Sequence, residues 1–230
     1  MGDVLAVQAR ELGRRFGRHW ALAHVDLDAR TGEVLLLAGP NGSGKTTLLR
    51  ILAGLSRPTV GELRVFGIDP AERRTDCRRA VSLITHQNYI YEALTALEMV
   101  RVWARLLGRS LDEEALLEPL VEVGLAHRKN EVVATFSAGM RKRLTLVRAR
   151  LEDPRLVLLD EPFAALDEPG QRLIERWIDD FRQRGVTVIM ASHALARASR
   201  LSSRAVFLEQ GQIRWQGPSA ALLERLEATA

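Results

Sequence analysis

The residues best suited to chemistry lie in one glycine-rich stretch that ends in Gly-Lys-Thr-Thr. Its members are Gly39, Pro40, Asn41, Gly42, Ser43, Gly44, Lys45, Thr46 and Thr47. Glycines allow successive backbone N–H groups to turn inward toward an anion. At this spacing Lys45 can reach the β and γ phosphates of a nucleotide, and the Thr46 hydroxyl can bind Mg²⁺. The stretch therefore predicts a site for a nucleoside triphosphate.

The flanking residues predict the strand and the helix that such a loop needs. Residues 33–38 are nearly continuous in apolar character, which favours a buried strand. Residues 45–53 carry leucines and an isoleucine at helical spacing, and Gly54 follows as a stop signal. A helix that begins at the loop directs the positive end of its dipole at the anion. A chance match in a glycine-rich turn would lack this frame.

Composition limits the classes of protein to which the chain can belong. Its 230 residues favour one domain, or one domain with an inserted lobe. Aromatic residues make up only 5% of a chain that is 47% hydrophobic, so the core must be mostly aliphatic, which suits a parallel sheet between helices. The formal net charge of +4 is too small to indicate nucleic-acid binding and is compatible with a position near an anionic membrane face.

The sequence shows no feature of export or of membrane insertion. The single cysteine, Cys77, excludes a disulfide within the chain and fits a reducing cytosol. Residues 1–10 lack a signal-peptide pattern, and no apolar run approaches the ~20 residues of a membrane helix. We therefore expect any membrane role to depend on a partner.

Hydrophobic periodicity predicts an α/β protein with two additions. Alternation predicts antiparallel strands near the N-terminus, at residues 4–9 and 25–29. Further strands are predicted at residues 61–66, 81–85, 155–160 and 186–191, and a hairpin at residues 205–209 and 212–215. Helices are predicted at residues 95–107, 112–123, 137–151, 169–184 and 220–228. The apolar stripe of residues 169–184 belongs to the core, and the arginine-rich residues 73–79 are expected to form a solvated surface segment.

The helices predicted at residues 95–107, 112–123 and 137–151 are expected to form one inserted lobe. Leu97, Val100, Leu106 and Leu107 are predicted near one face of the first of them, and Ser137 is predicted to cap the third. We expect one domain, with its core at residues 1–88 and 152–230 and the helical lobe at about residues 89–151.

A pair of acidic residues, Asp160 and Glu161, follows a strongly apolar strand. Adjacent acids alone usually belong to a solvated turn. Behind a buried strand, in a chain with a phosphate loop, Asp160 can hold Mg²⁺ from the side opposite Thr46. Glu161 can then polarise the attacking water. Together with Lys45, these residues predict hydrolysis of the nucleotide.

At this point the chain resembles the ATP-binding cassette (ABC) family over essentially its full length. The resemblance is carried by Phe16, Gln87, Phe136, Ser137, Ala138, Gly139, Met140, Ala164, Ala165, Leu166, Asp167 and His193. It implies a P-loop NTPase (RecA-like) core with an N-terminal antiparallel β-subdomain and an inserted α-helical subdomain. ATP and Mg²⁺ are the implied cofactors. Each residue alone has an ordinary explanation in packing or at the surface, but their order along the predicted elements makes them reinforce one another.

The resemblance also implies individual roles. Phe16 would stack on adenine, Gln87 would contact Mg²⁺ and couple to the helical lobe, and His193 would sense the γ-phosphate. The signature loop, Ser137 to Met140, would face the ATP of a partner subunit, and Asp167 would lie at the dimer interface. Phe136, Ala138 and Met140 depart from the common Leu-Ser-Gly-Gly-Gln motif. Ala138 adds one methyl, which is tolerated unless its φ is positive, and Met140 cannot make the hydrogen bonds of glutamine.

The implied partners are a second copy of the chain and transmembrane permease subunits, at the cytoplasmic face of the inner membrane. The permease would dock on residues 88–97, where Tyr89 and Tyr91 are exposed aromatic candidates or ordinary lobe-packing residues. No nucleic-acid partner is expected.

A narrower resemblance concerns the haem-exporter ATPases of cytochrome c maturation. It is carried by residues 86–87, 94–98, 137–139, 160–163 and 165–167. Met140 instead matches some drug or lipid exporters, which remain an alternative. Two other classes stay open: a soluble ABC ATPase that acts on nucleic acid or ribosomes, and a phosphate-loop kinase. The former usually carries a second cassette or basic extensions, and the latter does not need the signature loop, Asp167 and His193 in this order.

Overall fold

The computed structural model describes residues 4–85 and 90–227 of the chain. In these ranges the strands are β1 (Leu5–Phe16), β2 (His19–Arg30), β3 (Val34–Ala38), β4 (Val60–Val65), β5 (Val81–Ile84), β6 (Leu156–Asp160), β7 (Thr187–Ala191), β8 (Arg204–Glu209) and β9 (Gln212–Pro218). The helices are α1 (Lys45–Leu52), α2 (Arg74–Ala80), α3 (Ala96–Leu106), α4 (Glu113–Glu122), α5 (Ala138–Glu152), α6 (Glu168–Gln183), α7 (Leu195–Leu201) and α8 (Ser219–Glu227), with 3₁₀ turns η1 (Ala126–Arg128) and η2 (Val133–Thr135).

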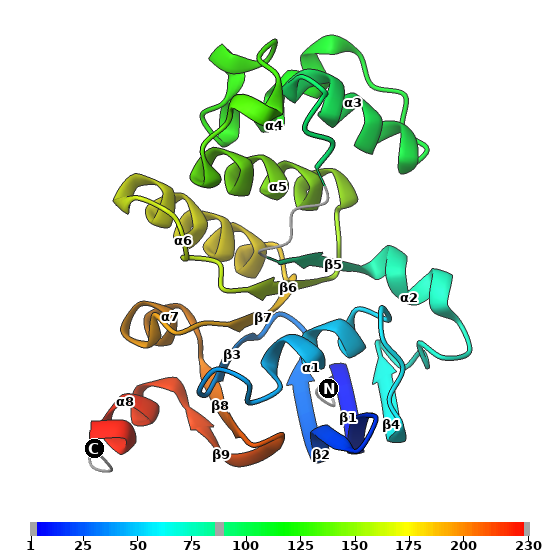
Figure 1. The fold of residues 1–230 in the computed structure, drawn as a ribbon, viewed down its shortest axis with the longest axis vertical. Coiled ribbons are helices and arrows are strands. Elements are labelled where there is room, and N and C mark those ends of the chain that lie inside the picture. Colours follow the sequence, from blue (N-terminus) through cyan, green and yellow to red (C-terminus); the bar gives the residue numbers. More distant parts are fainter. Residues whose placement is uncertain (1–3, 86–89, 228–230) are drawn as a thin grey trace.

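The strands form two sheets (Figure 1). The larger sheet has the order β5-β6-β7-β3-β8-β9, in which β9 pairs antiparallel with β8 and the other pairs are parallel. The smaller sheet, β2-β1-β4, is antiparallel throughout. The predicted α/β core with an N-terminal antiparallel β-subdomain is therefore confirmed.

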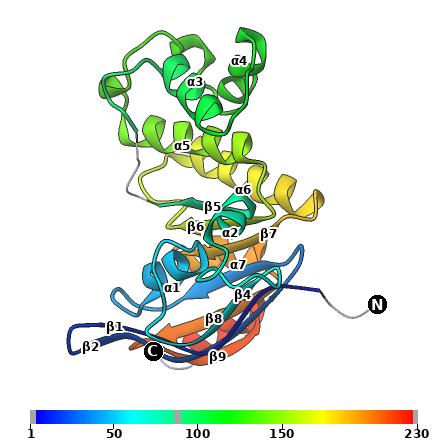
Figure 2. The same cartoon turned by 90° about the vertical axis from the view of Figure 1, so that its right-hand side faces the viewer.

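Alternate residues of the central strands divide the core between the two faces of the parallel sheet. Leu35 and Leu37 of β3 pack with α1 and the antiparallel sheet. Leu36, from the opposite face, packs with the buried side chains of α6 and of the central helices. In Figures 1 and 2, α1 lies between the two sheets, and α5 and α6 lie on the other side of the parallel sheet. Both faces of the sheet are thus covered, as its aliphatic strands require.

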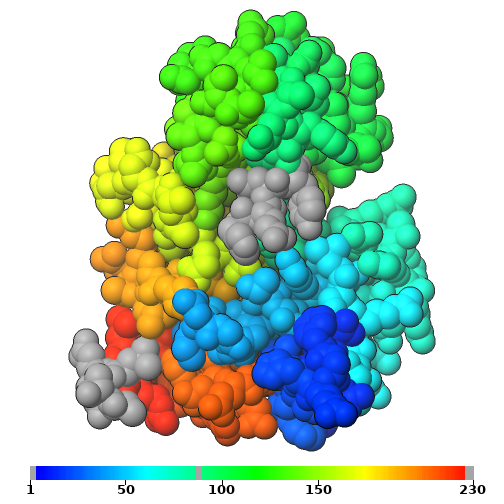
Figure 3. All heavy atoms as spheres, viewed as in Figure 1, coloured from blue at the N-terminus to red at the C-terminus, as the bar shows by residue number. Residues whose placement is uncertain are grey.

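The central helices α3, α4 and α5 gather at one end of the molecule, the upper end of Figures 1 and 3. Their caps follow the sequence: Thr95 makes a reciprocal capping box with Glu98, Asp112 caps α4, and Ser137 caps α5. Met99, Leu120 and Leu144 are among the side chains that bury the interior of this group. The predicted inserted α-helical lobe is therefore present.

Three local predictions were wrong or incomplete. The first strand continues beyond residue 9 to Phe16. Its β-bulges shift the β1–β2 register and Glu11 adopts a positive φ of 48°, so the alternation of the sequence is broken and did not indicate the second half of the strand. The arginine-rich segment forms α2 and buries Cys77. Residues 195–201, to which the sequence analysis assigned no element, form α7.

The predicted apolar face of α3 was also wrong in part. Leu97 and Val100 are buried, whereas Leu106 is 76% exposed and Leu107 is 40% exposed. Leu106 is nine residues from Leu97, which at 100° per residue places it on the opposite side of the helix. Leu106 and Leu107 line a surface groove of the helical lobe.

Candidate functional site

The glycine-rich loop takes the predicted place between β3 and α1. Gly39 adopts a φ of 141°, and a Cβ at this position would lie 2.0 Å from the Leu208 carbonyl oxygen. Gly44 adopts a φ of 106°, and its Cβ would lie 2.6 Å from the Ala21 carbonyl oxygen. Both positions combine a left-handed backbone with close contact to another backbone segment, so a side chain is excluded at each.

The ammonium group of Lys45 folds back over this loop. Its Nζ donates to the carbonyl oxygens of Gly39 and Pro40 at 2.7 and 2.9 Å. The side chain is buried, and burial lowers its pKa, while the charges of Glu161 and Asp160 act in the opposite direction. A cation is therefore held at the loop where phosphate oxygens would arrive.

Thr46 and Asp160 are 114 positions apart in the sequence, but their side chains are in contact. The Thr46 hydroxyl donates to Asp160 Oδ2 at 2.8 Å, and Asp160 is buried at the end of β6. A hydroxyl and a carboxylate offer the oxygen ligands that Mg²⁺ prefers. Among the described residues no cluster of three or more His, Cys, Asp or Glu side chains forms a metal cage. The pair therefore fits an ion that takes its remaining ligands from phosphates and water.

The carboxylate of Glu161 lies in a small polar network. Glu161 Oε2 accepts a hydrogen bond from the backbone N–H of His193 at 3.1 Å. The His193 Nε2 atom lies 2.7 Å from Asn41 Oδ1 and 3.3 Å from Glu161 Oε1. Because the Asn41 oxygen can only accept, this contact indicates a proton on Nε2. His193 therefore bridges the phosphate loop and the carboxylate.

These residues surround one cavity of about 320 Å³. It is lined by His19, Ala21, Asn41, Gly42, Ser43, Gly44, Lys45, Thr46, Thr47, Asp160, Glu161 and His193. Two buried oxygen atoms at this site, Ser43 Oγ and Glu161 Oε1, have no hydrogen-bond partner among the described residues. Buried polar groups normally have partners, so the site fits a polar ligand that supplies them.

The cavity lining also shows what the sequence analysis missed. His19 and Ala21 line the cavity from β2, but no sequence motif singled them out. Phe16 does not belong to the lining; it is 52% exposed, and the Arg14 guanidinium lies over its ring at 4.6 Å from the centroid. Its predicted stacking on adenine stays a prediction.

The signature loop lies outside the cavity of its own chain. Ser137 Oγ accepts from the Met140 backbone N–H at 3.2 Å, which makes it the cap of α5. Ala138 does not have a positive φ, so its methyl is tolerated as predicted. Met140 is half-buried and packs against the hydrophobic core instead of replacing glutamine hydrogen bonds.

The roles predicted for Asp167 and Gln87 stay predictions. Asp167 caps α6, because its Oδ1 accepts from the Gly170 N–H at 3.0 Å. Gln87, predicted as a Mg²⁺ contact, lies outside the described residues.

Comparison with known proteins decides the family. The model of the family described as ABC transporter matches residues 22–164, which is more than half of the chain. The chain belongs to the ABC transporter family. As a member of this family it is an ABC-type ATPase, and it binds ATP.

Curated relatives of this ABC ATPase include transport proteins with different cargoes. It is 31% identical to the glutamine transport ATP-binding protein GlnQ of Escherichia coli (strain K12), over 95% of this chain and 93% of the relative. It is 30% identical to the bacitracin transport ATP-binding protein BcrA of Bacillus licheniformis, over 95% and 72%. The sulfate/thiosulfate import ATP-binding protein CysA 1 of Agrobacterium fabrum is 34% identical, but this ABC ATPase spans only 63% of its length.

Solved structures with the same fold are also ABC cassettes. A structure described as the ATP-binding subunit of an ABC transporter matches with a TM-score of 0.86 and 28% identity, over 96% of this chain and 93% of that chain. The ATP-binding cassette MJ0796, described as a dimer in a post-hydrolysis state bound to ADP and Pi, matches with a TM-score of 0.83 and 26% identity, over 93% and 98%.

Proposed function

We propose that this ABC ATPase is the nucleotide-binding subunit of a membrane transporter and that it hydrolyses ATP at the cavity beside α1. The observation that carries this proposal is the convergence of Lys45, the Thr46–Asp160 pair and Glu161 on one cavity. Lys45 and the loop N–H groups would bind the β and γ phosphates, and Thr46, Asp160 and Gln87 would hold Mg²⁺. The ion would neutralise phosphate charge when bound.

In this proposal Glu161 orients the attacking water and accepts its proton. Its Oε1 atom has no hydrogen-bond partner among the described residues, so it can accept from a water molecule. His193, which already contacts Glu161 and Asn41, would donate to the γ-phosphate and report its presence. Phe16 would support the adenine at the open side.

The site would be completed by a second copy of the chain. Ser137 and Gly139 begin a helix whose N-terminus suits an anion, yet they do not line the cavity of their own chain. In a head-to-tail dimer these residues would cap the γ-phosphate of the partner, and Asp167 would lie at the interface. The dimeric relative MJ0796 supports this arrangement. ATP binding would then drive closure, and hydrolysis would release it.

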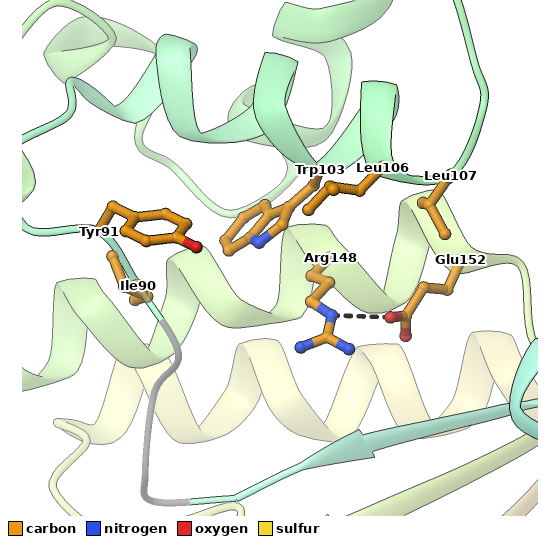
Figure 4. Close-up of a pocket in the computed structure, with 7 residues that line it drawn as sticks. All are labelled: Ile90, Tyr91, Trp103, Leu106, Leu107, Arg148 and Glu152. Carbon is orange, nitrogen blue, oxygen red and sulfur yellow. Dashed lines mark hydrogen bonds and ion pairs between the residues drawn. The ribbon is translucent and has the colours of Figure 1, made fainter.

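We further propose that a permease subunit docks in a groove of about 530 Å³ on the helical lobe (Figure 4). Trp103 and Leu106 line it from α3, Leu107 lines it just after that helix, and Tyr91, 64% exposed, lines its other end. Tyr89, the other aromatic candidate, lies outside the described residues. Exposed aromatic and aliphatic side chains of this kind commonly anchor a partner helix.

The floor of the groove carries one ion pair. Arg148 Nε donates to Glu152 Oε1 at 2.7 Å, and the other Glu152 oxygen is buried without a hydrogen-bond partner among the described residues. A docking segment with an apolar face and one N–H or O–H donor would fit this surface. No helix of the described residues has the length and apolar character required to cross a membrane. We propose that this contact holds the chain peripherally at the cytoplasmic face of the inner membrane.

The groove proposal predicts the effect of replacing Leu106 by aspartate. The charge would be placed on the docking surface, so we expect co-purification with membrane subunits to be lost while the ATPase activity of the isolated chain stays within about twofold of the parent. Val121→Asp is the matched control, because Val121 is similarly exposed on α4 but does not line the groove. Undiminished membrane association of Leu106→Asp would contradict the proposal, and co-purification with ribosomes or nucleic acid would favour the soluble class instead.

For the cargo we propose haem, or release of a haem-loaded chaperone, in cytochrome c maturation. The support is the narrower sequence resemblance, including Ala138 in the signature loop. Export of a drug or lipid is the second candidate, which Met140 and the relative BcrA favour. His193 lines the nucleotide cavity and is not assigned to haem, and His86, expected beside the nucleotide as well, lies outside the described residues.

Deletion of the gene tests the cargo directly. We expect covalent haem attachment to periplasmic cytochromes c to be lost and to be restored by the parent gene but not by one encoding Lys45→Ala. Haem staining of periplasmic proteins measures this. Normal cytochromes c in the deletion strain would eliminate the haem assignment and leave the drug or lipid exporter.

A further inference from the structure

Lys142 is a buried cation that has no role in the proposed hydrolysis of ATP. It lies on α5, five residues after the Ser137 cap, and its side chain is only 5% exposed. Its Nζ donates to the backbone carbonyl of Glu161 and, at 3.2 Å, to that of Ala164. Burial lowers the pKa of Lys142 to about 8, while the charges of Glu161 and Asp160 act in the opposite direction. A buried charge is costly unless it is hydrogen-bonded, and these two carbonyls meet that need.

The acceptors of Lys142 belong to residues 161–165, which we call the catalytic turn. Glu161 adopts a φ of 51° and Ala165 a φ of 60°, a region that residues with a Cβ rarely occupy. Such a backbone persists only where surrounding contacts hold it. Within the turn, the Ala164 N–H donates to the Glu161 carbonyl at 3.3 Å. Lys142 adds a charged donor to the same carbonyl from outside the turn.

The start of α5 contacts the catalytic turn as well. A Cβ on Gly139 would lie 3.2 Å from the Ala165 carbonyl oxygen, so the helix backbone packs closely on the turn. Helix α5 therefore contacts residues 161–165 at two points, about one turn of helix apart. A rigid helix held at two points cannot move without moving the turn.

We propose that Lys142 is a positioning residue that ties the signature helix to the catalytic turn and thereby sets the place of the Glu161 carboxylate. The inference rests on the proposed function, in which Ser137 and Gly139 meet the ATP of the partner chain. Displacement of α5 by that contact reaches Glu161 of the same chain through Lys142. Nucleotide binding at one site of the dimer is thus coupled to hydrolysis at the other. Lys142 itself acts through the Glu161 peptide and does not line the cavity.

The test compares Lys142→Met with Arg143→Met in the full chain. Arg143 is the matched control, because it also lies on α5 and donates from a cation to a backbone carbonyl, that of Val123 at 3.0 Å, away from the turn. We expect Lys142→Met to lower kcat by about 10- to 100-fold, the range expected from misplacing a reacting group by up to 1 Å. KM for ATP and ATP-dependent dimer formation should stay within about twofold of the parent. Lys142→Arg should recover part of kcat, and Arg143→Met should keep it.

Parent-like kcat in Lys142→Met overturns the inference, and so does an equal loss in both methionine variants, which would indicate general helix stability. Should Lys142→Met fail to fold, Lys142→Leu also removes the donor, and parent-like kcat in that variant overturns the inference too. A parent chain that neither hydrolyses ATP nor dimerises contradicts the proposed function, and the inference falls with it. An active parent beside an equally active Lys142→Met refutes the inference alone.

Discussion

Glu161→Gln is expected to lower kcat by at least about 100-fold, since general-base catalysis contributes roughly 10²- to 10⁴-fold. The glutamine keeps the size of the side chain but loses the charge that draws a proton from water. The Glu161 carboxylate is well placed for this step: one oxygen accepts from the His193 N–H, and the other, 3.3 Å from His193 Nε2, has no hydrogen-bond partner among the described residues. ATP should still bind, because the phosphate loop is unchanged.

Without hydrolysis to release it, the Glu161→Gln variant should accumulate as a closed dimer. Phosphate release measures the loss of turnover, and size-exclusion chromatography with ATP and Mg²⁺ measures the dimer. Glu131→Gln is the control, because Glu131 is exposed in the helical lobe, where its carboxylate pairs with Arg128 at 3.0 Å, and it does not line the nucleotide cavity. Full hydrolysis by Glu161→Gln would remove Glu161 from the proposed role.

Lys45→Ala is expected to weaken ATP binding by about 10- to 150-fold. This range corresponds to the ~1.5–3 kcal/mol that a hydrogen bond to a charged group contributes. Among the described residues that line the cavity, there is no arginine and no other lysine that could replace Lys45. Its ammonium must leave the carbonyls of Gly39 and Pro40 to meet a phosphate, so part of the gross interaction is already offset in the free state.

Isothermal titration with ATP and Mg²⁺ measures this loss of affinity. Lys129→Ala serves as the control, since Lys129 pairs with Glu113 in the helical lobe, far along the chain from the phosphate loop. Thermal unfolding without nucleotide separates loss of the phosphate contact from loosening of the loop. Unchanged affinity in Lys45→Ala would contradict the assigned role of the lysine.

Residues 39–47 made the phosphate loop predictable, because its chemistry depends on neighbours in sequence. Glycines at fixed spacing, the strand before them and the helix after them are all local features. The same holds for the cap Ser137 and for the core stripe of α6, since each depends on contacts within one or two turns of helix.

Other elements escaped the sequence because tertiary contacts override local patterns. The second half of β1 is polar, but pairing with β2 and β4 makes it a strand, with bulges that break its alternation. The arginines of residues 73–79 suggested only a surface, yet burial of Cys77 organises them as α2. Lys142 belongs to the basic run of residues 141–143, and only the fold buries it.

The family resemblance, the phosphate loop and the acidic pair could be recognised from residue type and spacing alone. Which groups meet depends on the fold: Thr46 contacts Asp160 across 114 positions, His193 contacts Asn41 across 152, and Lys142 contacts the carbonyl of Glu161. The physical reason is that parallel strands bring their carboxyl ends to one edge of the sheet, whatever their distance in sequence. The pairing of β3, β6 and β7 therefore assembles the site from three separate segments.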